Sequence, residues 1–127
     1  MLQQVKEEVL ATYAAFLAAF QADDLAALNA LIQFPFAYIG QGSTVLLDTF
    51  PIQPAALRAA KQWHDTKDFG YEVVFASNDK AHLIVRQATR IRADGSPIET
   101  VSAFYALTRT PPGWKFFALS DITIPAS

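Results

Sequence analysis

Cysteine is absent from the 127-residue sequence, glycine occurs only five times and histidine only twice. The lack of cysteine excludes disulfide bonds, zinc–cysteine centres and thiol nucleophiles. It is consistent with a reducing compartment, so we expect a cytoplasmic protein. Positive charge is also scarce, because the formal net charge is −2 and the isoelectric point is about 5.5. Without a positive field that attracts phosphate backbones, we do not expect nucleic-acid binding.

The two histidines do not predict a metal site. His64 and His82 have no second histidine, aspartate or glutamate at metal-ligand spacing, apart from Asp65 next to His64. Adjacent residues on a helix point in different directions and cannot share one ion. We therefore expect no metal, and no motif in the sequence indicates another cofactor.

No long hydrophobic run is present. The stretch from Val9 to Ala22 is the only one that approaches a membrane span, and it is too short to cross a bilayer. Lys6 is followed by Glu7 and Glu8, whereas a secretory signal peptide begins with a positive segment. We interpret the stretch as a buried helix and expect no membrane association.

Apolar residues are plentiful. They make up 52% of the sequence, which contains ten phenylalanines, four tyrosines and two tryptophans. A chain of this length has room for one domain, so we predict a single domain over residues 1–127. This composition offers more apolar surface than one small core easily buries, which predicts a ligand cavity, a dimer interface or both.

The spacing of apolar residues predicts an α+β fold. Val5, Val9, Tyr13, Phe16 and Phe20 form one stripe of a helix. Two aspartates then provide the N-cap of a second helix, and a proline begins a third. Beyond residue 70 the apolar period changes to two, which is typical of strands. The predicted helices cover about 3–21, 25–32 and 54–65, and the predicted strands cover about 36–40, 44–48, 71–77, 80–93, 97–109 and 114–124.

The Asp94-Gly95 dipeptide predicts a two-residue hairpin turn, which fixes the pairing of its strands. This register places Arg90 opposite Glu99, and it places Arg86 on the same face of the sheet as Tyr105. Further along, it pairs Arg86 with Ala103 and Ile84 with Tyr105. Neither face is cleanly polar, so we expect helices to cover one and a second copy of the chain to cover the other.

The order of these elements resembles the nuclear transport factor two-like (NTF2-like) superfamily over the whole chain. The local signatures are the corner Gln21-Ala22-Asp23-Asp24-Leu25 and the Gly113-Trp114-Lys115 sequence before the last strand. The resemblance implies three helices packed on a strongly curved, mixed or antiparallel sheet of about six strands. It also implies a conical cavity open at one end and a homodimer formed through the outer sheet face.

Some members of this superfamily are enzymes, among them ketosteroid isomerase, polyketide cyclases, scytalone dehydratase and limonene epoxide hydrolase. Ketosteroid isomerase uses an aspartate base with a tyrosine and a protonated aspartate as oxyanion donors. In this sequence the position of its tyrosine falls on Phe16 and that of its protonated acid falls near Tyr105. Its base falls within Tyr38 to Gln41, where no carboxylate occurs. The steroid-isomerase mechanism is therefore not expected.

Several residues remain candidates for a site. Tyr105 could donate a hydrogen bond to a ligand carbonyl, although a buried tyrosine more often serves packing. Arg86 could bind a carboxylate, although an interface ion pair is the preferred interpretation of Arg86. Asp121 could serve as an acid or base, because a carboxylate on a mostly apolar strand favours a raised pKa. Aromatic residues that could line a cavity, or simply fill a core, are Tyr13, Phe16, Tyr38 and Trp63.

Three functions are compatible with these residues. The first is a protein that binds a small apolar ligand with a polar or anionic end, held by Arg86 and Tyr105. The second is a cofactor-independent isomerase, dehydratase or hydrolase that uses Asp121 and Tyr105. The third is a dimerisation module whose cavity is filled by its own side chains.

Overall fold

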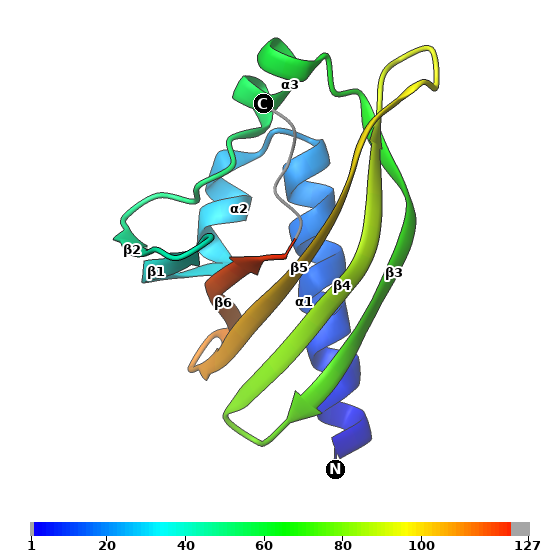
Figure 1. The fold of residues 1–127 in the computed structure, drawn as a ribbon. Coiled ribbons are helices and arrows are strands. Elements are labelled where there is room, and N and C mark those ends of the chain that lie inside the picture. Colours follow the sequence, from blue (N-terminus) through cyan, green and yellow to red (C-terminus); the bar gives the residue numbers. More distant parts are fainter. Residues whose placement is uncertain (1, 123–127) are drawn as a thin grey trace.

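A computed structural model describes residues 2–122 of the chain. Within this range, helices and a single sheet form the α+β architecture expected from the sequence (Figure 1). The helices are α1 (Leu2–Gln21), α2 (Leu25–Ala30) and α3 (Pro54–Lys61). The strands are β1 (Ile32–Ile39), β2 (Thr44–Leu47), β3 (Asp65–Ala76), β4 (Lys80–Ile91), β5 (Pro97–Thr110) and β6 (Gly113–Asp121).

The first helix buries the predicted stripe except for its last member, Phe20, which is partly buried. Val5, Val9, Tyr13 and Phe16 are each at most 4% exposed. The helix is followed by the predicted corner, in which the carboxylate of Asp24 accepts a hydrogen bond from the backbone N–H of Ala27 at 3.1 Å and caps α2. The N-terminal part of the chain therefore follows directly from helical periodicity and capping.

The third helix is shorter than predicted. It begins at Pro54 as expected, but it ends at Lys61 because Gln62 adopts a left-handed backbone with φ of 59°. The chain then leaves the helix axis, and β3 begins at Asp65 rather than near residue 71. Trp63 consequently lies in the short connection between helix and strand, where its side chain is 3% exposed.

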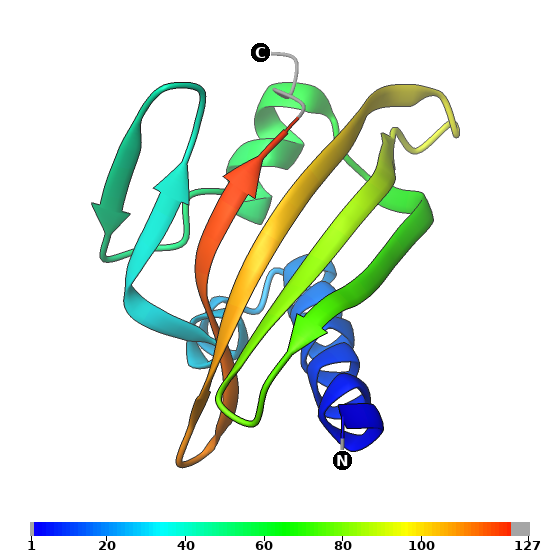
Figure 2. The ribbon, with the colours of Figure 1, turned by 60° about the horizontal axis from the view of Figure 1, so that its bottom comes forward.

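The six strands form one mixed sheet in the order β2-β1-β6-β5-β4-β3. β1 runs parallel to β6, and the other neighbouring strands are antiparallel. Figure 2 shows the long strands crossing in front of the helices, so that the helices cover one face of the sheet. The predicted antiparallel meander is confirmed, and the early strand β1 begins at Ile32, four residues before the predicted start.

The predicted two-residue turn of the β4–β5 hairpin is wrong, because the backbone N–H of Arg92 donates to the carbonyl of Ser96 and leaves three residues in the loop. Ile91 pairs with Pro97, and a register shift between Arg90 and Ile91 then brings residues 88–90 into the predicted register. Arg90 lies opposite Glu99, but the register shifts between Val85 and Ala88. A β-bulge adds one residue to a strand, so the side chains beyond it change face relative to a regular strand. Both predicted pairings beyond the bulge are wrong. Instead of Arg86 with Ala103 and Ile84 with Tyr105, the structure pairs Val85 with Ala103, Ile84 with Phe104 and Leu83 with Tyr105.

Polar side chains bond the backbone around this bulge. The hydroxyl of Ser102 donates to the carbonyl of Arg86 at 2.7 Å. The amide of Gln87 donates to the carbonyl of Asp68 at 3.1 Å, and Asp68 itself has a positive φ of 56° within β3. The bulge in β4 and the irregular part of β3 therefore lie side by side, and the hydrogen bond from Gln87 to Asp68 joins them.

The hydrophobic core lies between the helices and the inner face of the sheet. Its most deeply buried large side chains are Leu28, Phe36, Phe50, Leu83, Leu107, Phe116 and Leu119, each at most 1% exposed. Within residues 2–122, no helix is long and apolar enough to cross a membrane. The cytoplasmic location expected from the sequence remains a prediction.

Candidate ligand cavity

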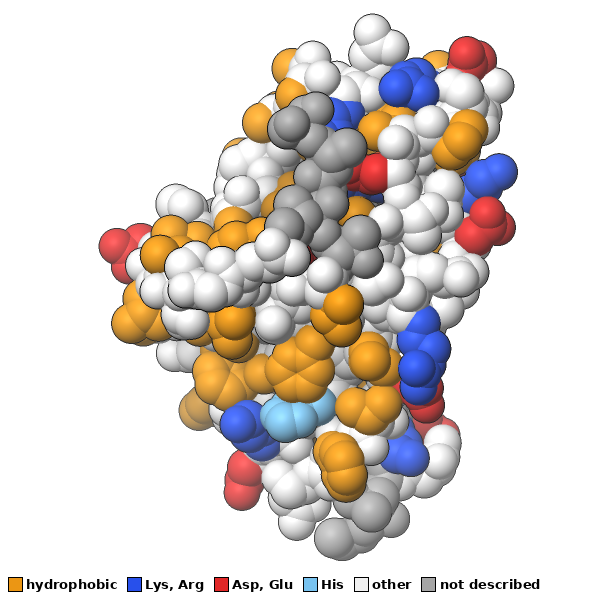
Figure 3. Space-filling view, viewed as in Figure 1, with side chains coloured by type: hydrophobic (Ala, Val, Ile, Leu, Met, Phe, Trp, Pro, Cys, Tyr) orange, Lys and Arg blue, Asp and Glu red, His pale blue; other side chains and the backbone are white. Residues whose placement is uncertain are grey.

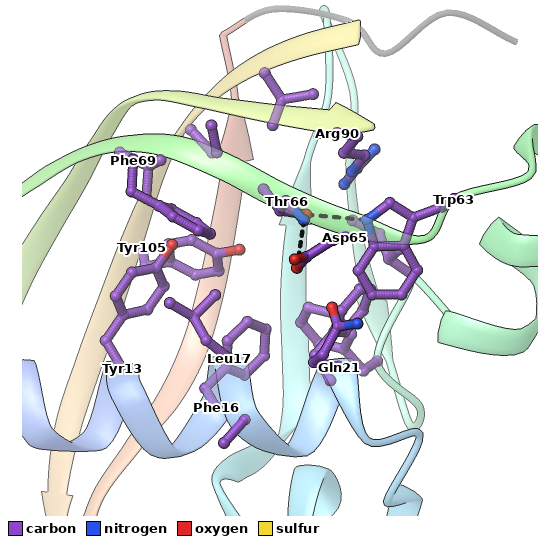
Figure 4. Close-up of a pocket in the computed structure, with 18 residues that line it drawn as sticks. Tyr13, Phe16, Leu17, Gln21, Trp63, Asp65, Thr66, Phe69, Arg90 and Tyr105 are labelled. Atoms are coloured by element: carbon purple, nitrogen blue, oxygen red, sulfur yellow. Dashed lines mark hydrogen bonds between the residues drawn. The ribbon is translucent and has the colours of Figure 1, made fainter. Parts of the chain in front are cut away.

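A cavity of about 300 Å³ lies between α1 and the inner face of the sheet. One wall is formed by Tyr13, Phe16 and neighbouring residues of α1, and the opposite wall by residues of β4 and β5. The connection from α3 into β3 closes one end (Figure 4). The volume lies at the lower limit of the usual 300–1,000 Å³ range for ligand sites. It is also about twice the ~150 Å³ of a cavity that holds one benzene ring.

Most of the lining is aromatic or aliphatic. The ring of Phe16 packs 5.4 Å from that of Phe50 and 6.0 Å from that of Tyr105, in both cases edge to face. Phe69 covers part of the cavity from β3 and is 37% exposed. Aliphatic lining comes from Leu17, Ile52, Val85, Ala88, Val101 and Ala103. Such a surface favours a ligand that is largely apolar.

Two tyrosine hydroxyls are the polar groups at one end of the cavity. Tyr13 and Tyr105 are 3% and 8% exposed, and their rings lie 6.0 Å apart. Within residues 2–122, neither hydroxyl has a hydrogen-bond partner in the protein, and no fully buried side-chain polar atom lacks one, so both hydroxyls reach the open space of the cavity. Figure 4 shows both hydroxyls directed toward the interior of the cavity. They are therefore available to a ligand oxygen or nitrogen.

Burial sets the protonation state of these tyrosines. It raises the pKa of Tyr13 above its usual value, and the neighbouring tyrosines add to this effect. Burial also raises the pKa of Tyr105, where the negative charge of Asp121 adds to the shift and the positive charge of Arg90 opposes it. Both side chains are therefore neutral phenols at physiological pH and can donate a hydrogen bond.

At the other end of the cavity, most donors are already in use. The indole N–H of Trp63 donates to the hydroxyl of Thr66 at 3.0 Å, and the amide of Gln21 donates to the carbonyl of His64 at 2.8 Å. The carboxylate of Asp65 accepts from the backbone N–H of Thr66 at 2.8 Å. These contacts hold the chain in position where it leaves α3 and enters β3.

Arg90 is the cationic residue of the lining. Its Nη1 donates to Glu99, and Glu99 accepts a second hydrogen bond from Lys61 at 2.8 Å. The three side chains are 11%, 5% and 16% exposed, so this is a largely buried cluster of two cations and one anion. Burial would raise the pKa of Glu99, but the hydrogen bonds from Lys61 and Arg90 outweigh it and lower that pKa below its usual value. Glu99 is therefore ionised, and the cluster carries a net positive charge.

The predicted catalytic candidates occupy different positions. Tyr105 lines the cavity, whereas Asp121 does not. Asp121 lies opposite Ala103 near the end of β6, where its carboxylate accepts a hydrogen bond from the hydroxyl of Tyr38. That bond, followed by burial and the negative charge of Asp121, raises the pKa of Tyr38 to about 12. Tyr38 is thus engaged with Asp121, and it also lies outside the lining.

Arg86 lies outside the cavity. Its side chain is 62% exposed and forms an ion pair with Glu72 of β3. The prediction that Arg86 shares a face with Tyr105 is wrong, because the bulge between Val85 and Ala88 changes the side to which the following residues point. An ion pair was the alternative interpretation of Arg86, and the structure shows one within a single chain.

The structure thus brings together four of the sequence candidates, Tyr13, Phe16, Trp63 and Tyr105. Arg90 was not predicted as a lining residue, because its pairing with Glu99 is a sufficient explanation of an arginine at this position. Phe69 was not predicted either, since the segment around it was not predicted to be a strand. Nothing in the local sequence marks either position, and both depend on irregular backbone in β3 and β4.

Solved structures with the same arrangement of elements provide a comparison. An NTF2-like protein with a cystatin-like fold from Novosphingobium aromaticivorans is 18% identical, with a TM-score of 0.63, over 95% of this chain and 82% of its own. An NTF2-like protein of unknown function in nutrient uptake from Rhodospirillum rubrum is 24% identical, with a TM-score of 0.64, over 91% of this chain and 98% of its own. This chain has the NTF2-like, cystatin-like fold. No protein-family model matches the sequence, and no similar sequence is found among the curated proteins.

The NTF2-like fold does not assign an activity. A ketosteroid isomerase-like protein from Erwinia carotovora is 20% identical, with a TM-score of 0.54, over 93% of this chain and 96% of its own. Likeness at this level of identity shows the fold alone, because unrelated functions share such folds. Within residues 2–122, no group of three histidine, aspartate or glutamate side chains is placed to hold a metal ion.

Proposed function

We propose that this NTF2-like chain binds a small, largely apolar molecule in the cavity between α1 and the sheet. The observation that carries the proposal is an aromatic cavity of about 300 Å³, into which the hydroxyls of Tyr13 and Tyr105 open without a hydrogen-bond partner among residues 2–122. A cavity filled by its own side chains, as in a pure dimerisation module, would leave no such volume. A ligand that accepts hydrogen bonds from the two phenols would satisfy both groups.

A cavity-filling substitution tests this proposal. Val101 lines the cavity, so Val101→Phe places a larger side chain where the ligand would lie. The control is Ala11→Phe, which adds a phenyl ring on the exposed side of α1. Binding of 2-naphthol is measured by calorimetry, with circular dichroism to verify that both variants are folded. We expect wild type and Ala11→Phe to bind and Val101→Phe to bind at least tenfold more weakly. Equal binding by all three proteins would contradict the proposal.

A cofactor-independent enzyme is the second candidate. Asp121 and Tyr105 lie on neighbouring strands, and the carboxylate acts electrostatically on the phenol. An isomerase, dehydratase or hydrolase could use this pair as base and oxyanion donor. Against it, Asp121 lies outside the cavity lining and is bonded to Tyr38. If a substrate is found, unchanged turnover by Asp121→Asn would exclude this mechanism.

We also propose a homodimer formed through the outer face of the sheet. His82 and Phe104 pack edge to face there, with ring centroids 4.7 Å apart, and Phe75 at the end of β3 is 75% exposed. Figure 3 shows hydrophobic side chains gathered around a histidine on this side of the molecule. An apolar patch of this kind favours burial against a second copy.

Light scattering coupled to size-exclusion chromatography tests the dimer. Phe104→Asp places a charge in the patch and is expected to shift the mass from dimer to monomer. Leu46→Asp is the control, because Leu46 is 69% exposed on β2 at the far end of the strand order. A monomeric wild type, or a dimer unaffected by Phe104→Asp, would refute the proposed interface.

A further inference from the structure

The cavity has two chemically different ends. The phenols of Tyr13 and Tyr105 are neutral donors at one end, while Arg90 brings a full positive charge toward the other from β4. Figure 4 shows the guanidinium of Arg90 on the side of the cavity near Trp63, away from Tyr13. A ligand that spans the cavity would therefore meet an uncharged donor pair and a cation at opposite ends.

The charge of Arg90 is not cancelled by its partner. Glu99 is shared between Arg90 and Lys61, so one negative charge faces two positive charges. Asp65 is the other charged group that lines the cavity, and its side chain is exposed, which allows water to screen its field. Arg90 is only 11% exposed, so its charge acts through a less polar medium and over a longer distance.

Arg90 also has hydrogen-bond donors to spare. A guanidinium carries five N–H groups, and the hydrogen bond from Arg90 to Glu99 uses Nη1. Within residues 2–122, Nε and Nη2 of Arg90 have no partner. Together these two atoms form the side-on fork that binds both oxygens of a carboxylate. The other donors at this end, on Trp63 and Gln21, already bond Thr66 and His64.

We propose that the ligand is a small aromatic carboxylate whose carboxylate binds the free fork of Arg90 and whose ring lies among Phe16, Phe69 and Tyr105. This assignment rests on the proposed binding function. The cavity volume of about 300 Å³ fits one substituted ring or two fused rings. A hydroxyl or carbonyl on the far side of the ring would be positioned near the two tyrosine hydroxyls.

Matched probes test the charge requirement. 6-Hydroxy-2-naphthoate is compared with 6-hydroxy-2-naphthamide, which keeps the shape and loses the charge, by calorimetry at pH 7. Charge-assisted hydrogen bonds contribute about 1.5–3 kcal/mol, so we expect the carboxylate to bind roughly tenfold or more tightly than the amide. Equal affinities would overturn this inference and leave the proposed function intact. Binding of neither probe, nor of 2-naphthol, would refute the proposed function together with it.

Two variants distinguish ligand recognition from a structural role of the charged cluster. Arg90→Gln and Lys61→Gln each remove one cation from Glu99, but only Arg90 lines the cavity. We expect Arg90→Gln to lower carboxylate affinity at least tenfold while amide affinity changes less than threefold. Lys61→Gln removes the excess positive charge of the cluster but leaves the fork of Arg90 in place, so it should lower carboxylate affinity clearly less than Arg90→Gln does and change amide affinity less than threefold. If both variants weaken carboxylate binding equally, or if Arg90→Gln weakens both probes equally, Arg90 is not the anion receptor.

Discussion

Replacing Glu99 with glutamine tests how strongly the charged cluster holds α3 to the sheet. Glu99 of β5 bonds Lys61 at the end of α3 and Arg90 of β4, and its side chain is 5% exposed. Glutamine has nearly the same shape but no charge, so the two cations would remain close together without a counter-ion. Removing one partner of a fully buried ion pair costs about 3–5 kcal/mol. Because Lys61 and Arg90 keep some contact with water, we expect Glu99→Gln to lower the free energy of unfolding by roughly 2–4 kcal/mol.

The stabilisation that the charge of Glu99 contributes depends on pH in a defined way. Glu99 has a folded-state pKa below its usual value, so its stabilisation is present above the unfolded pKa of about 4.3 and is lost as pH falls through the folded value. Urea unfolding of wild type and variant is measured at pH 7 and at several values down to pH 3. The difference in free energy of unfolding between wild type and Glu99→Gln should be largest at pH 7 and should shrink toward pH 3.

A matched exposed pair serves as control. Glu72 bonds Arg86 across β3 and β4, but their side chains are 51% and 62% exposed. Glu72→Gln should therefore lower the free energy of unfolding by no more than about 1 kcal/mol. If Glu99→Gln costs no more than Glu72→Gln, or if its cost is the same at pH 3 and pH 7, the cluster does not act as a buried charge network.

Two smaller predictions concern single hydrogen bonds. Asp24→Ala removes the side-chain cap of α2 and should lower the free energy of unfolding by about 1 kcal/mol, and an unchanged urea midpoint would contradict the capping role. Tyr38 has a pKa of about 12, chiefly because its hydroxyl bonds Asp121, so ultraviolet titration should show one phenol ionising near that pH. In Asp121→Asn that step should move toward pH 10, and an unmoved step would show that another group sets it.

The sequence predicted what depends on local and periodic signals. The α1 stripe, the capping aspartate of α2 and Pro54 at the start of α3 all act within one or two helical turns. The pairing of Arg90 with Glu99 was also predicted, although it depends on a register shift between Arg90 and Ile91 that compensates for a loop one residue longer than expected. The helical features need no knowledge of the rest of the chain, so one sequence is enough to predict them.

The candidate site was predicted less completely, because it depends on the positions where β3 and β4 depart from the regular two-residue alternation of a strand. The irregular part of β3 includes Gly70, where a β-carbon would lie 3.4 Å from the side chain of Gln87. The bulge in β4 occurs at the same level and is bonded through Gln87 to Asp68. Neither irregularity has a recognisable motif, since each is stabilised by contacts between strands. Aromatic lining from α1 was predicted, whereas the lining from β3 and β4 was not.

This bulge determines which arginine can meet a ligand. Arg86 and Arg90 are four residues apart and would share a face in a regular strand. With the extra residue between them, Arg86 lies on the outer side with Glu72, whereas Arg90 joins Val85 and Ala88 in lining the cavity. Identical side chains thus meet different surroundings, and only the buried one keeps a weakly screened charge next to an apolar wall. A carboxylate-bearing ligand would therefore owe its recognition to one irregular step in the backbone, a common role of bulges beside functional sites.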